Sequence, residues 1–596
     1  MICDTSPFIL LDDARDGGEA VPARLYSDPL EILQAHTPAE LSAVLDQLGE
    51  AKKRGLHAAG YMSYEAGLAM EGRLVKYLPY ERACPLAWFG LFKDYSLLEP
   101  DSVLRQLPDA KGAWLGSLKP GLTRQDYDHA FQRVQDYILA GDIYQANLTF
   151  RAYAAYAGHP LALYAAIRDR AKAGYGGAIF DGKNWMLSFS PELFFAMKDG
   201  RITAKPMKGT AARVSDTTAD AEVRVELQSD PKQRAENLMI VDLLRNDLSR
   251  VAEPGSVEVP ELFHVESYPT IHQMTSTVTA KLADNYGAVD LLRQIYPCGS
   301  ITGAPKIRAM EIIDELEKDQ RGIYCGSIGR IDARGDAAFN VAIRTFFLTE
   351  GQESLSIGLG SGIVADSVGG DEWRECLAKG RFATVSHGVN QGVDSMIAVD
   401  LIETMAFDPE LGILRLEAHL ERMKASAAAL EFEFDRHAAR NTIQAITFHQ
   451  DKPAKVRLML SRSGAIAIEL RPMPEPLNEP VVVKLAPMQA NAQDYRLHHK
   501  TSDRSVYDAP DVKGDAHPIF YNSDGYLTEG AIWNIFVERD GKLVTPPLSR
   551  GLLPGILRRE LLESGEAMEA DLQAGDLDSG FYVGNSLRGL VKAELA

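Results

Sequence analysis

The chain has 596 residues, a formal net charge of −20, 45% hydrophobic residues and 24% charged residues. This length exceeds what one hydrophobic core usually serves, so we expect at least two domains. The acidic charge disfavours nucleic acid as a partner, because phosphate backbones bind basic surfaces.

The targeting and redox signals favour a cytoplasmic protein. No run of ~18 apolar residues is present, so we expect no membrane span. The N-terminus lacks the basic segment and apolar run of a signal peptide. The five cysteines show neither metal nor disulfide spacing, which fits a reducing compartment.

Hydrophobic periodicity predicts helices and strands in blocks rather than in strict alternation. We expect helices over 39–54, 123–140, 235–248 and 372–382, and a mostly helical stretch over 278–317. We expect strands over 7–11, 87–92, 325–332, 337–348 and 354–364, a strand after the turn at Gly141, and two strands within 185–197. This arrangement predicts an α+β fold of layered sheets and helices.

Residues 386–395 are polar and glycine-rich, which is the composition of a linker. They divide the chain into a domain of residues 1–385 and a second domain of residues 396–596, long enough to fold as its own unit. An amphipathic helix is expected over 416–432 of the second domain.

The stretch Ala204–Arg213 places Lys208 beside Gly209, which lets the backbone approach a ligand closely. A lysine that is desolvated or set beside another cation has a lowered pKa and becomes a nucleophile. Taken alone, a Lys-Gly-Thr sequence is more often a surface loop. The neighbouring motifs decide between the two interpretations.

Two predicted helices offer carboxylates. Spacings of three and seven put Glu372, Glu375 and Lys379 on one helix face, and Glu236 lies on the other helix. Such carboxylates could hold Mg²⁺, although by pattern alone solvated helix faces are more frequent. Arg344 and the glycines of 358–362 could cradle a substrate carboxylate, or be a strand-edge arginine and a hairpin turn.

Seven segments in this order resemble the chorismate-utilising enzymes, which include anthranilate, isochorismate, salicylate and aminodeoxychorismate synthases. The resemblance covers roughly residues 1–385. The segments that carry it are Asp142–Asn147, Ser190–Glu192, Pro206–Thr210, Glu236–Asp242, Ser300–Lys306, Tyr324–Gly329 and Gly360–Val364.

The resemblance implies a set of residue roles. A lysine at position 208 is similar to the aminodeoxychorismate synthases, since anthranilate-type and salicylate-type members have alanine there. Lys208 would attack C2 of chorismate, and Glu192 would protonate the departing C4 hydroxyl. Gln145 stands where water-adding members carry a lysine base, which favours ammonia as the nucleophile.

The resemblance also implies the surrounding ligands. Mg²⁺ would bind Glu236, Glu372 and Glu375 and anchor the ring carboxylate. The remaining substrate-binding residues would be Thr302, Gly303, Tyr324, Arg344, Gly360, Gly362 and Lys379. One departure is Gln273, which stands where anthranilate synthases have a histidine.

In the second domain, a lysine, a carboxylate and an arginine near a helix N-terminus could form a pyridoxal phosphate site. Singly, each residue is more often an ordinary surface or strand residue. Together they resemble the fold-type IV pyridoxal phosphate enzymes, which include aminotransferases and aminodeoxychorismate lyase. By this resemblance Lys500 binds the cofactor covalently and Glu529 pairs with the pyridine nitrogen. The phosphate would be bound by Arg422, Gly555, Ile556 and Ser586.

The motifs do not separate lyase from aminotransferase, but the fusion favours the lyase. We therefore expect a bifunctional enzyme that makes 4-aminobenzoate, a folate precursor, from chorismate and ammonia. The alternatives are an anthranilate-type synthase joined to a class IV aminotransferase, and a binding or regulatory protein that keeps a dead synthase fold. No glutaminase-like segment is visible, so we expect a separate glutamine amidotransferase subunit. A homodimer through the second domain is a further expectation.

Overall fold

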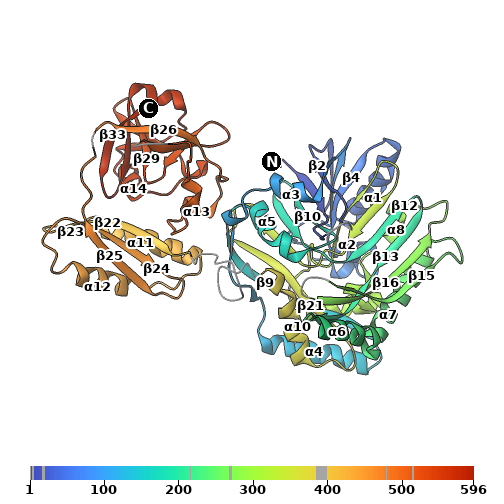
Figure 1. Ribbon diagram of the computed structural model, residues 1–596. Helices are drawn as coiled ribbons and strands as arrows, with labels where there is room; N and C mark the ends of the chain where they lie inside the picture. The colour runs from blue at the N-terminus through green and yellow to red at the C-terminus, as the bar shows by residue number, and fades with distance from the viewer. Residues whose placement is uncertain are drawn as a thin grey trace. The chain divides into compact units, whose positions relative to one another are not determined.

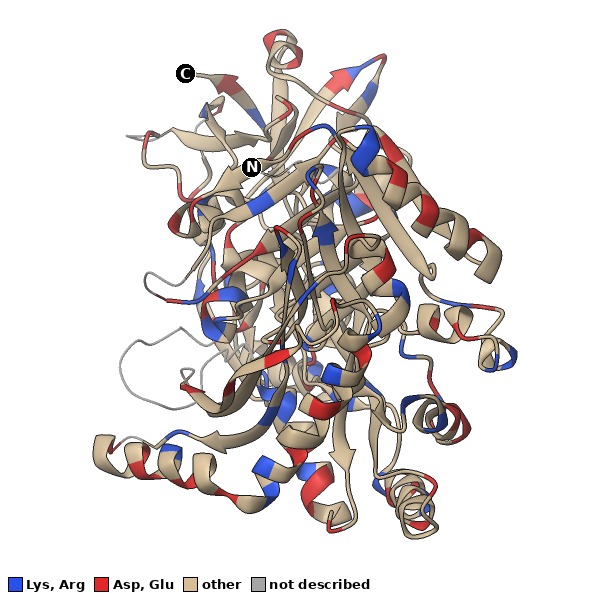
Figure 2. Cartoon of the chain, turned by 90° about the vertical axis from the view of Figure 1, so that its right-hand side faces the viewer, with Lys and Arg blue, Asp and Glu red and all other residues tan. Residues whose placement is uncertain are grey.

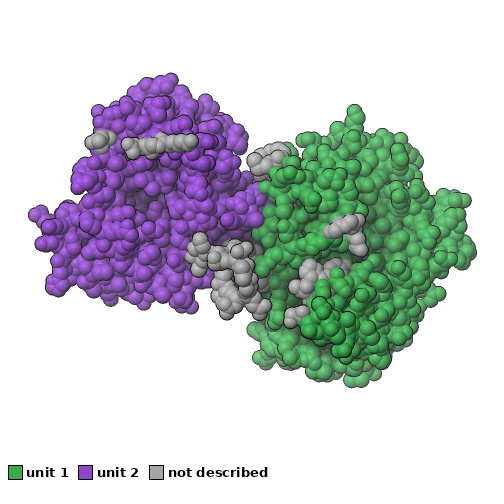
Figure 3. All heavy atoms as spheres, in the orientation of Figure 1, with its two compact units in different colours: residues 1–107, 117–154, 164–384 green, residues 108–116, 155–163, 385–596 purple. Residues whose placement is uncertain are grey.

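The computed structural model describes residues 2, 6–16, 20–214, 216–267, 271–383, 399–477, 479–512 and 516–596. The chain forms two compact units (Figure 3). Unit 1 comprises residues 1–107, 117–154 and 164–384, and unit 2 comprises residues 108–116, 155–163 and 385–596. The linker predicted at 386–395 lies outside the described residues and stays a prediction.

Unit 1 is organised around two large sheets (Figure 1). The first runs in the order β17 (Gly303–Ala304), β9 (Gln145–Ala157), β21 (Ser354–Ile363), β20 (Thr345–Thr349), β11 (Asn184–Ser188), β10 (Gly176–Phe180), β1 (Phe8–Asp12), β2 (Ala23–Ser27) and β6 (Ser96–Leu98), with β8 (Lys119–Pro120) also paired to β9. The end of β9 from residue 155 on belongs to unit 2, where β7 (Trp114–Leu115) pairs with it. The second runs in the order β14 (Met207–Ala212), β16 (Ile271–Lys281), β13 (Arg201–Lys205), β12 (Leu193–Lys198), β19 (Ala337–Asn340), β18 (Ser327–Ile331), β4 (His57–Met62), β5 (Ala87–Phe92) and β3 (Glu31–Ala35), with β15 (Glu258–Ser267) also paired to β16.

The two sheets pack on each other through buried apolar side chains. Ile9 and Met186 of the first sheet share a core cluster with Tyr61 and Trp88 of the second. A larger cluster covers the other face of the second sheet and includes Leu45 of α1 and Leu244 of α7. Burial of these apolar surfaces is the dominant favourable contribution to folding.

The helices of unit 1 begin at local sequence signals. Thr37 and Thr123 form capping boxes before α1 and α4, and Asp230 accepts a hydrogen bond from the backbone of Gln233 to cap α7. The helices are α1 (Pro38–Lys53), α2 (Glu65–Met70), α3 (Pro100–Gln106), α4 (Arg124–Leu139), α5 (Pro160–Ala171), α6 (Thr217–Ser229), α7 (Pro231–Ser249), α8 (Ala288–Ile295), α9 (Lys306–Leu316) and α10 (Gly369–Lys379).

Unit 2 contains a four-stranded sheet in the order β23 (Gly412–Ile413), β22 (Leu401–Asp408), β24 (Ala454–Leu460) and β25 (Ile466–Pro472). The helices α11 (Leu416–Ala429) and α12 (Arg436–Thr447) share its buried apolar cluster. A second sheet runs in the order β28 (Leu527–Gly530), β27 (His517–Tyr521), β26 (Val481–Pro487), β33 (Gly589–Leu595), β32 (Phe581–Asn585), β29 (Asn534–Arg539), β30 (Lys542–Thr545) and β31 (Ala567–Glu569). Two further helices are α13 (Tyr495–His498) and α14 (Ile556–Glu563).

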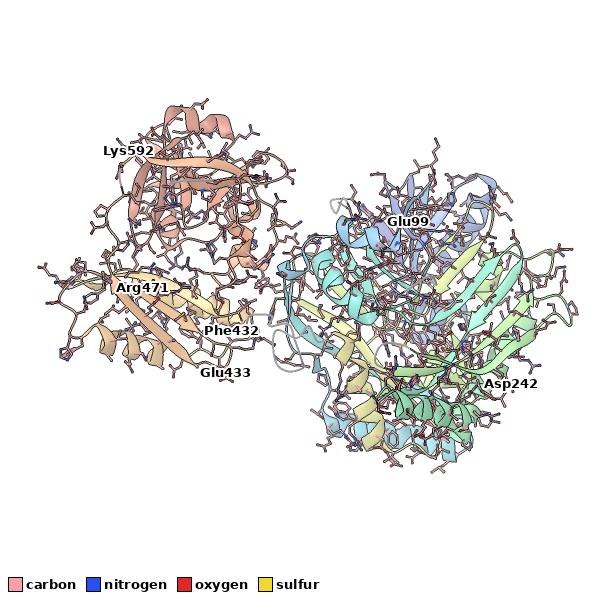
Figure 4. All side chains as sticks on the ribbon, in the orientation of Figure 1. Glu99, Asp242, Phe432, Glu433, Arg471 and Lys592 are labelled. Carbon is pink, nitrogen blue, oxygen red and sulfur yellow. The ribbon has the colours of Figure 1, made fainter. Side chains whose placement is uncertain are left out.

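The α+β prediction is confirmed, with local corrections. Residues 278–281 were expected to be helical but end strand β16, because they pair with β13 in the sheet. The strand expected over 337–348 is two strands, β19 and β20, which belong to different sheets. Leu238 of α7 is apolar but 43% exposed. The labelled Asp242 lies on the exposed side of the same helix (Figure 4).

Acidic and basic positions are interspersed along the cartoon of the chain (Figure 2). Along the described residues, no helix combines the length and apolar content needed to cross a membrane.

Candidate active sites

Unit 1 contains a cavity of about 410 Å³ whose wall is formed by several elements of both sheets and by helices α7 and α10. It is lined by ten of the residues singled out from the sequence: Glu192, Lys208, Glu236, Tyr324, Arg344, Gly360, Gly362, Glu372, Glu375 and Lys379. Gln145, Thr302 and Gly303 are not in this lining. Thr302 instead donates its hydroxyl to backbone carbonyls, and Gly303 pairs with β9.

Lys208 reaches the cavity from an irregularity in strand β14. The pairing of β14 with β16 shifts between Met207 and Thr210, and Gly209 there has φ +91°, a conformation that favours glycine. Gln273 donates its amide to the Gly209 carbonyl at 2.8 Å and accepts the Thr210 hydroxyl at 2.9 Å. These bonds fix the segment that presents Lys208, so this lysine is not part of a free surface loop.

Desolvation lowers the pKa of Lys208, and the positive charge of Lys379 lowers it further. A lowered pKa increases the fraction of neutral amine near pH 7, which is the nucleophilic form. The structure therefore gives Lys208 both features that the sequence argument required.

Glu192 follows the Ser190–Pro191 turn and is only 4% exposed. Its backbone is fixed by Val341, which donates to the Glu192 carbonyl, and its Oε1 accepts the Ser300 hydroxyl at 2.7 Å. Burial raises the pKa of Glu192 to about 7, against the lowering effects of Ser300 and Lys208. A carboxyl with a pKa near neutrality can hold and donate a proton at neutral pH.

Gln145 is 1% exposed, and neither polar atom of its side-chain amide has a hydrogen-bond partner within the described part of the chain. A Cβ atom added to Gly362 would lie 2.9 Å from Gln145 Nε2 and 3.1 Å from Lys208 Nζ. The two side chains therefore face the same glycine. An unpaired buried amide is costly, which favours a ligand that completes its hydrogen bonds.

Three carboxylates line the cavity from two helices, Glu236 on α7 and Glu372 and Glu375 on α10. Burial raises the pKa of Glu236, and the nearby charges of Glu372 and Glu375 raise it further. Glu375 makes an ion pair with Lys379 at 2.7 Å. Among the described residues, no group of three or more His, Cys, Asp or Glu side chains is close enough together to hold a metal ion.

The donor chemistry still suits Mg²⁺, which is commonly bound by one or two carboxylates and keeps several waters. The Mg²⁺ site therefore stays a prediction.

Glycine is needed at three positions of β21 for different structural reasons. A Cβ on Gly358 would overlap the ring of Tyr324, and one on Gly360 would approach the backbone of Leu148. The Gly360 carbonyl accepts from Lys379 at 2.9 Å. Close packing therefore requires glycine at 358 and 360, whereas Gly362 leaves space in front of the functional side chains.

Several residues that line the cavity had no role predicted from the sequence. Ser300 lies in a segment that carried the family resemblance, but no spacing signal linked it to Glu192. Lys232 lines the same cavity and pairs with Asp366 at 3.3 Å.

Unit 2 contains a cavity of about 340 Å³. It is lined by all six residues that the sequence predicted for a pyridoxal phosphate site: Arg422, Lys500, Glu529, Gly555, Ile556 and Ser586. Burial lowers the pKa of Lys500 to about 7, helped by the positive charges of Arg504 and Arg422. A neutral lysine amine is the form that reacts with a carbonyl group.

The charged side chains of Arg422 and Glu529 in this site are held by buried partners. Arg422 donates Nε and Nη2 to the two oxygens of Glu403 at 2.8 and 2.7 Å, and His419 Nδ1 lies 2.6 Å from Glu403 Oε2. Glu529 accepts the Tyr507 hydroxyl at 2.7 Å and the backbone N–H of Leu553 at 2.9 Å. Burial raises the pKa of Glu529 to about 7, while Tyr507 lowers it.

The residues around this cavity fit an anionic cofactor and substrate. Helix α14 starts after Gly555 without a side-chain cap, so its first N–H groups are available to a phosphate. Further cationic side chains line the cavity, and the sequence analysis assigned them no role: Lys455, Arg457, Arg504 and Arg588. Buried nitrogens of Arg457 and Arg504 have no hydrogen-bond partner within the described part of the chain.

Two family models match the chain. The model for chorismate binding enzymes matches residues 6–385, and the model for class IV amino-transferases matches residues 400–594. The chain therefore belongs to the chorismate binding enzyme family and carries a class IV aminotransferase domain after it. The second domain implies pyridoxal phosphate as cofactor. Both resemblances noted in the sequence are confirmed.

The relatives refine this class. The chain is 44% identical over 286 residues to aminodeoxychorismate synthase component 1 of Klebsiella aerogenes, covering 46% of this chain and 63% of that protein. It is 40% identical over 265 residues to anthranilate synthase component 1 of Pseudomonas aeruginosa, covering 44% of this chain and 54% of that protein. The chain thus spans less than two thirds of the length of either relative.

The crystal structure of anthranilate synthase component I from Streptococcus pneumoniae has the same fold, with a TM-score of 0.52 and 24% identity over 62% of this chain and 93% of that one.

Proposed function

We propose that the chain is a bifunctional enzyme in which unit 1 converts chorismate and ammonia into 4-amino-4-deoxychorismate, and unit 2 converts that product into 4-aminobenzoate and pyruvate. The observation that carries the proposal is the cavity of unit 1, which Lys208, with its lowered pKa, lines together with Glu192 and Lys379. Gln145 faces the same Gly362 as Lys208. The name of the Klebsiella relative supports the product, and the chorismate binding family supports the substrate.

The first step uses Lys208 as a nucleophile. Its neutral amine forms a bond to C2 of chorismate while the C4 hydroxyl leaves, and Glu192 gives that oxygen a proton to form water. Ammonia then adds at C4, and the bond between C2 and Lys208 breaks. The added nitrogen loses one proton, which restores the proton of Glu192. The net change replaces the C4 hydroxyl with an amino group, releases water and returns Lys208 and Glu192 to their starting states.

The surrounding residues bind and orient the substrate. Arg344 and the backbone at Gly362 would contact a carboxylate, and the amide of Gln145 would orient ammonia rather than remove a proton from water. Glu236, Glu372 and Glu375 would hold Mg²⁺, which would supply positive charge next to the ring carboxylate.

In unit 2, pyridoxal phosphate supplies an electron sink at the substrate amine. Arg422, Ser586 and the N-terminus of α14 would bind its phosphate, and Glu529 would pair with its pyridine nitrogen. Lys500, as a neutral amine, would remove the proton at C4 of the ring. The ring becomes aromatic as the enolpyruvyl group leaves, and protonation of that group gives pyruvate.

The ammonia is proposed to come from a separate glutamine amidotransferase subunit. The printed name "component 1" of the Klebsiella relative implies a second component for that protein. The test is to supply glutamine or ammonium to the purified chain with chorismate. Ammonium should support turnover and glutamine alone should not, so unaided use of glutamine would reject this part of the proposal.

The whole proposal is tested by identifying the products by mass, beside Lys208→Ala and Lys500→Ala. Anthranilate as the product would instead identify an anthranilate-type synthase. Failure to consume chorismate with ammonium would identify a protein without synthase activity.

A further inference from the structure

A short hydrogen-bonded chain of buried side chains ends on the carboxyl group of Glu192. Cys298 Sγ lies 3.2 Å from Ser300 Oγ, and Ser300 Oγ lies 2.7 Å from Glu192 Oε1. Cys298, Ser300 and Glu192 are 5%, 3% and 4% exposed. Ser300 and Glu192 also line the cavity of unit 1. A catalytic role for this chain of side chains rests on the proposed function of that cavity.

The direction of this chain follows from the donors available. Burial raises the pKa of the Cys298 thiol to about 12, so the thiol keeps its proton at neutral pH and can donate to Ser300. A serine hydroxyl has one hydrogen, and an ionised carboxylate only accepts. When Glu192 is ionised, Ser300 therefore donates to Oε1 and accepts from Cys298.

A protonated Glu192 can carry its proton on Oε1 or on Oε2. A proton on Oε1 would force the Ser300 hydrogen to turn toward the sulfur of Cys298, which is a weak acceptor. A proton on Oε2 leaves the whole chain in place. Both arrangements keep one O–H···O hydrogen bond between Ser300 and Glu192. The ionised carboxylate is the stronger acceptor, so the Ser300 hydrogen bond stabilises it more than the neutral acid.

We propose that Ser300, oriented by Cys298, is a positioning residue that holds the carboxyl group of Glu192 through Oε1 and sets the pH at which Glu192 gives up its proton. The charges of Lys208 from β14 and Lys379 from α10 also act on Glu192, and the backbone N–H of Met207 bonds it. Among these side chains Ser300 is the one that donates a hydrogen bond to Oε1.

Whether Ser300 raises or lowers the pKa of Glu192 depends on which protonation state of Glu192 it stabilises. Its hydrogen bond favours the ionised carboxylate and so lowers a pKa that burial has raised. Removing the hydroxyl should raise the pKa of Glu192 by about one pH unit. The carboxyl group would also lose a hydrogen bond that orients it, so kcat should fall about tenfold with little change in KM.

The direct experiment is an infrared titration of the protonated carboxyl band in the full chain, with Glu192→Gln used to identify the band. The variants are Ser300→Ala, Ser300→Thr, which keeps a hydroxyl, and Cys298→Ala with Cys298→Ser. A control is Ser63→Ala, which removes another buried serine hydroxyl, one that bonds the Leu86 carbonyl.

We expect Ser300→Ala to titrate at higher pH than wild type, Ser300→Thr to restore the wild-type value, and Ser63→Ala to leave it unchanged. Cys298→Ala should shift the band in the same direction by less, and Cys298→Ser should not. If Ser300→Ala does not fold, the Cys298 pair decides, because an unchanged band in Cys298→Ala would then overturn the proposal.

This titration needs no turnover, so it separates the two claims. An active wild-type enzyme whose band is unchanged in Ser300→Ala would reject the role of Ser300 and leave the proposed function standing. A band that shifts as expected in a chain that does not consume chorismate would reject the proposed function and leave the hydrogen-bonded chain standing. The alkaline limb of the pH–rate profile should shift upward with the band in Ser300→Ala.

Discussion

Lys208 and Gln145 meet at Gly362, whose missing side chain leaves the space that both occupy. An added Cβ would lie 3.1 Å from the Lys208 amine and 2.9 Å from the Gln145 amide. The Lys208 amine and the Gln145 amide can thus lie close to the β21 backbone because Gly362 has no Cβ atom. This relationship makes Gly362 a sensitive position for the first reaction.

The change Gly362→Ala should reduce the rate of aminodeoxychorismate formation by roughly tenfold to a hundredfold, because small displacements of reacting groups have effects of that size. The backbone of Gly362 is not in the left-handed region, so the fold should tolerate alanine. The measurement is the steady-state rate with chorismate and ammonium, together with the melting temperature. Gly49→Ala is the control, since a Cβ there meets no described atom within 4 Å. Full activity in Gly362→Ala would contradict the geometry.

The buried pair of Glu403 and Arg422 predicts how the stability of unit 2 depends on pH. Burial opposes ionisation of Glu403, but Arg422 and His419 outweigh it and lower the pKa of Glu403 to about 2. The folded pKa is depressed, so this stabilisation is present above the unfolded value near 4.5 and is lost as pH falls toward 2. The contribution is of the order of 3 kcal/mol.

The change Glu403→Gln should lower the free energy of unfolding at pH 7 by about 3 kcal/mol, because it leaves a buried arginine without its counter-charge. It should also flatten the pH dependence between pH 4.5 and 2. Urea unfolding across this range checks both. An unchanged acid dependence would show that Glu403 is not the group responsible.

The hydroxyl of Tyr507 predicts the strength of cofactor binding. It donates to Glu529 Oε1 at 2.7 Å, and the Arg504 guanidinium lies 4.0 Å from the Tyr507 ring centroid. Tyr507→Phe removes this donor, so the pKa of Glu529 should rise and its pairing with a protonated pyridine nitrogen should weaken. A loss of about tenfold in affinity for pyridoxal phosphate is expected.

Affinity for the cofactor can be measured by absorbance without any substrate. Tyr521→Phe serves as the control, because it removes a hydroxyl from β27 outside the cavity lining. Equal affinities of wild type and Tyr507→Phe would show that the hydroxyl does not hold Glu529 in its binding position.

Much of both cavities could be predicted from the sequence because the family resemblance rests on residues that converge in space. Arg422 of α11, Glu529 of β28 and Lys500, which follows α13, line one cavity. The helix expected over 235–248 is α7, which spans Pro231–Ser249. It begins earlier than expected because Asp230 caps its N-terminus.

The remaining features depend on tertiary contacts that spacing does not reveal. Ser300 bonds Glu192 across 108 residues of sequence. Lys455 and Arg457 could have been found from the alternation of polar and buried apolar residues along β24, which puts them on one face opposite Val456. Residues 278–281 form a strand rather than the predicted helix, because pairing with β13 outweighs local propensity.

The most direct test of the central claim is a product analysis. The purified chain is incubated with chorismate, Mg²⁺, ammonium and pyridoxal phosphate, beside Lys208→Ala and Lys500→Ala. We predict that wild type gives 4-aminobenzoate and pyruvate, that Lys500→Ala stops at aminodeoxychorismate, and that Lys208→Ala makes neither product at the wild-type rate. Anthranilate from wild type, or aminodeoxychorismate that persists although the cofactor is bound, would contradict the assignment of unit 1 or unit 2 respectively.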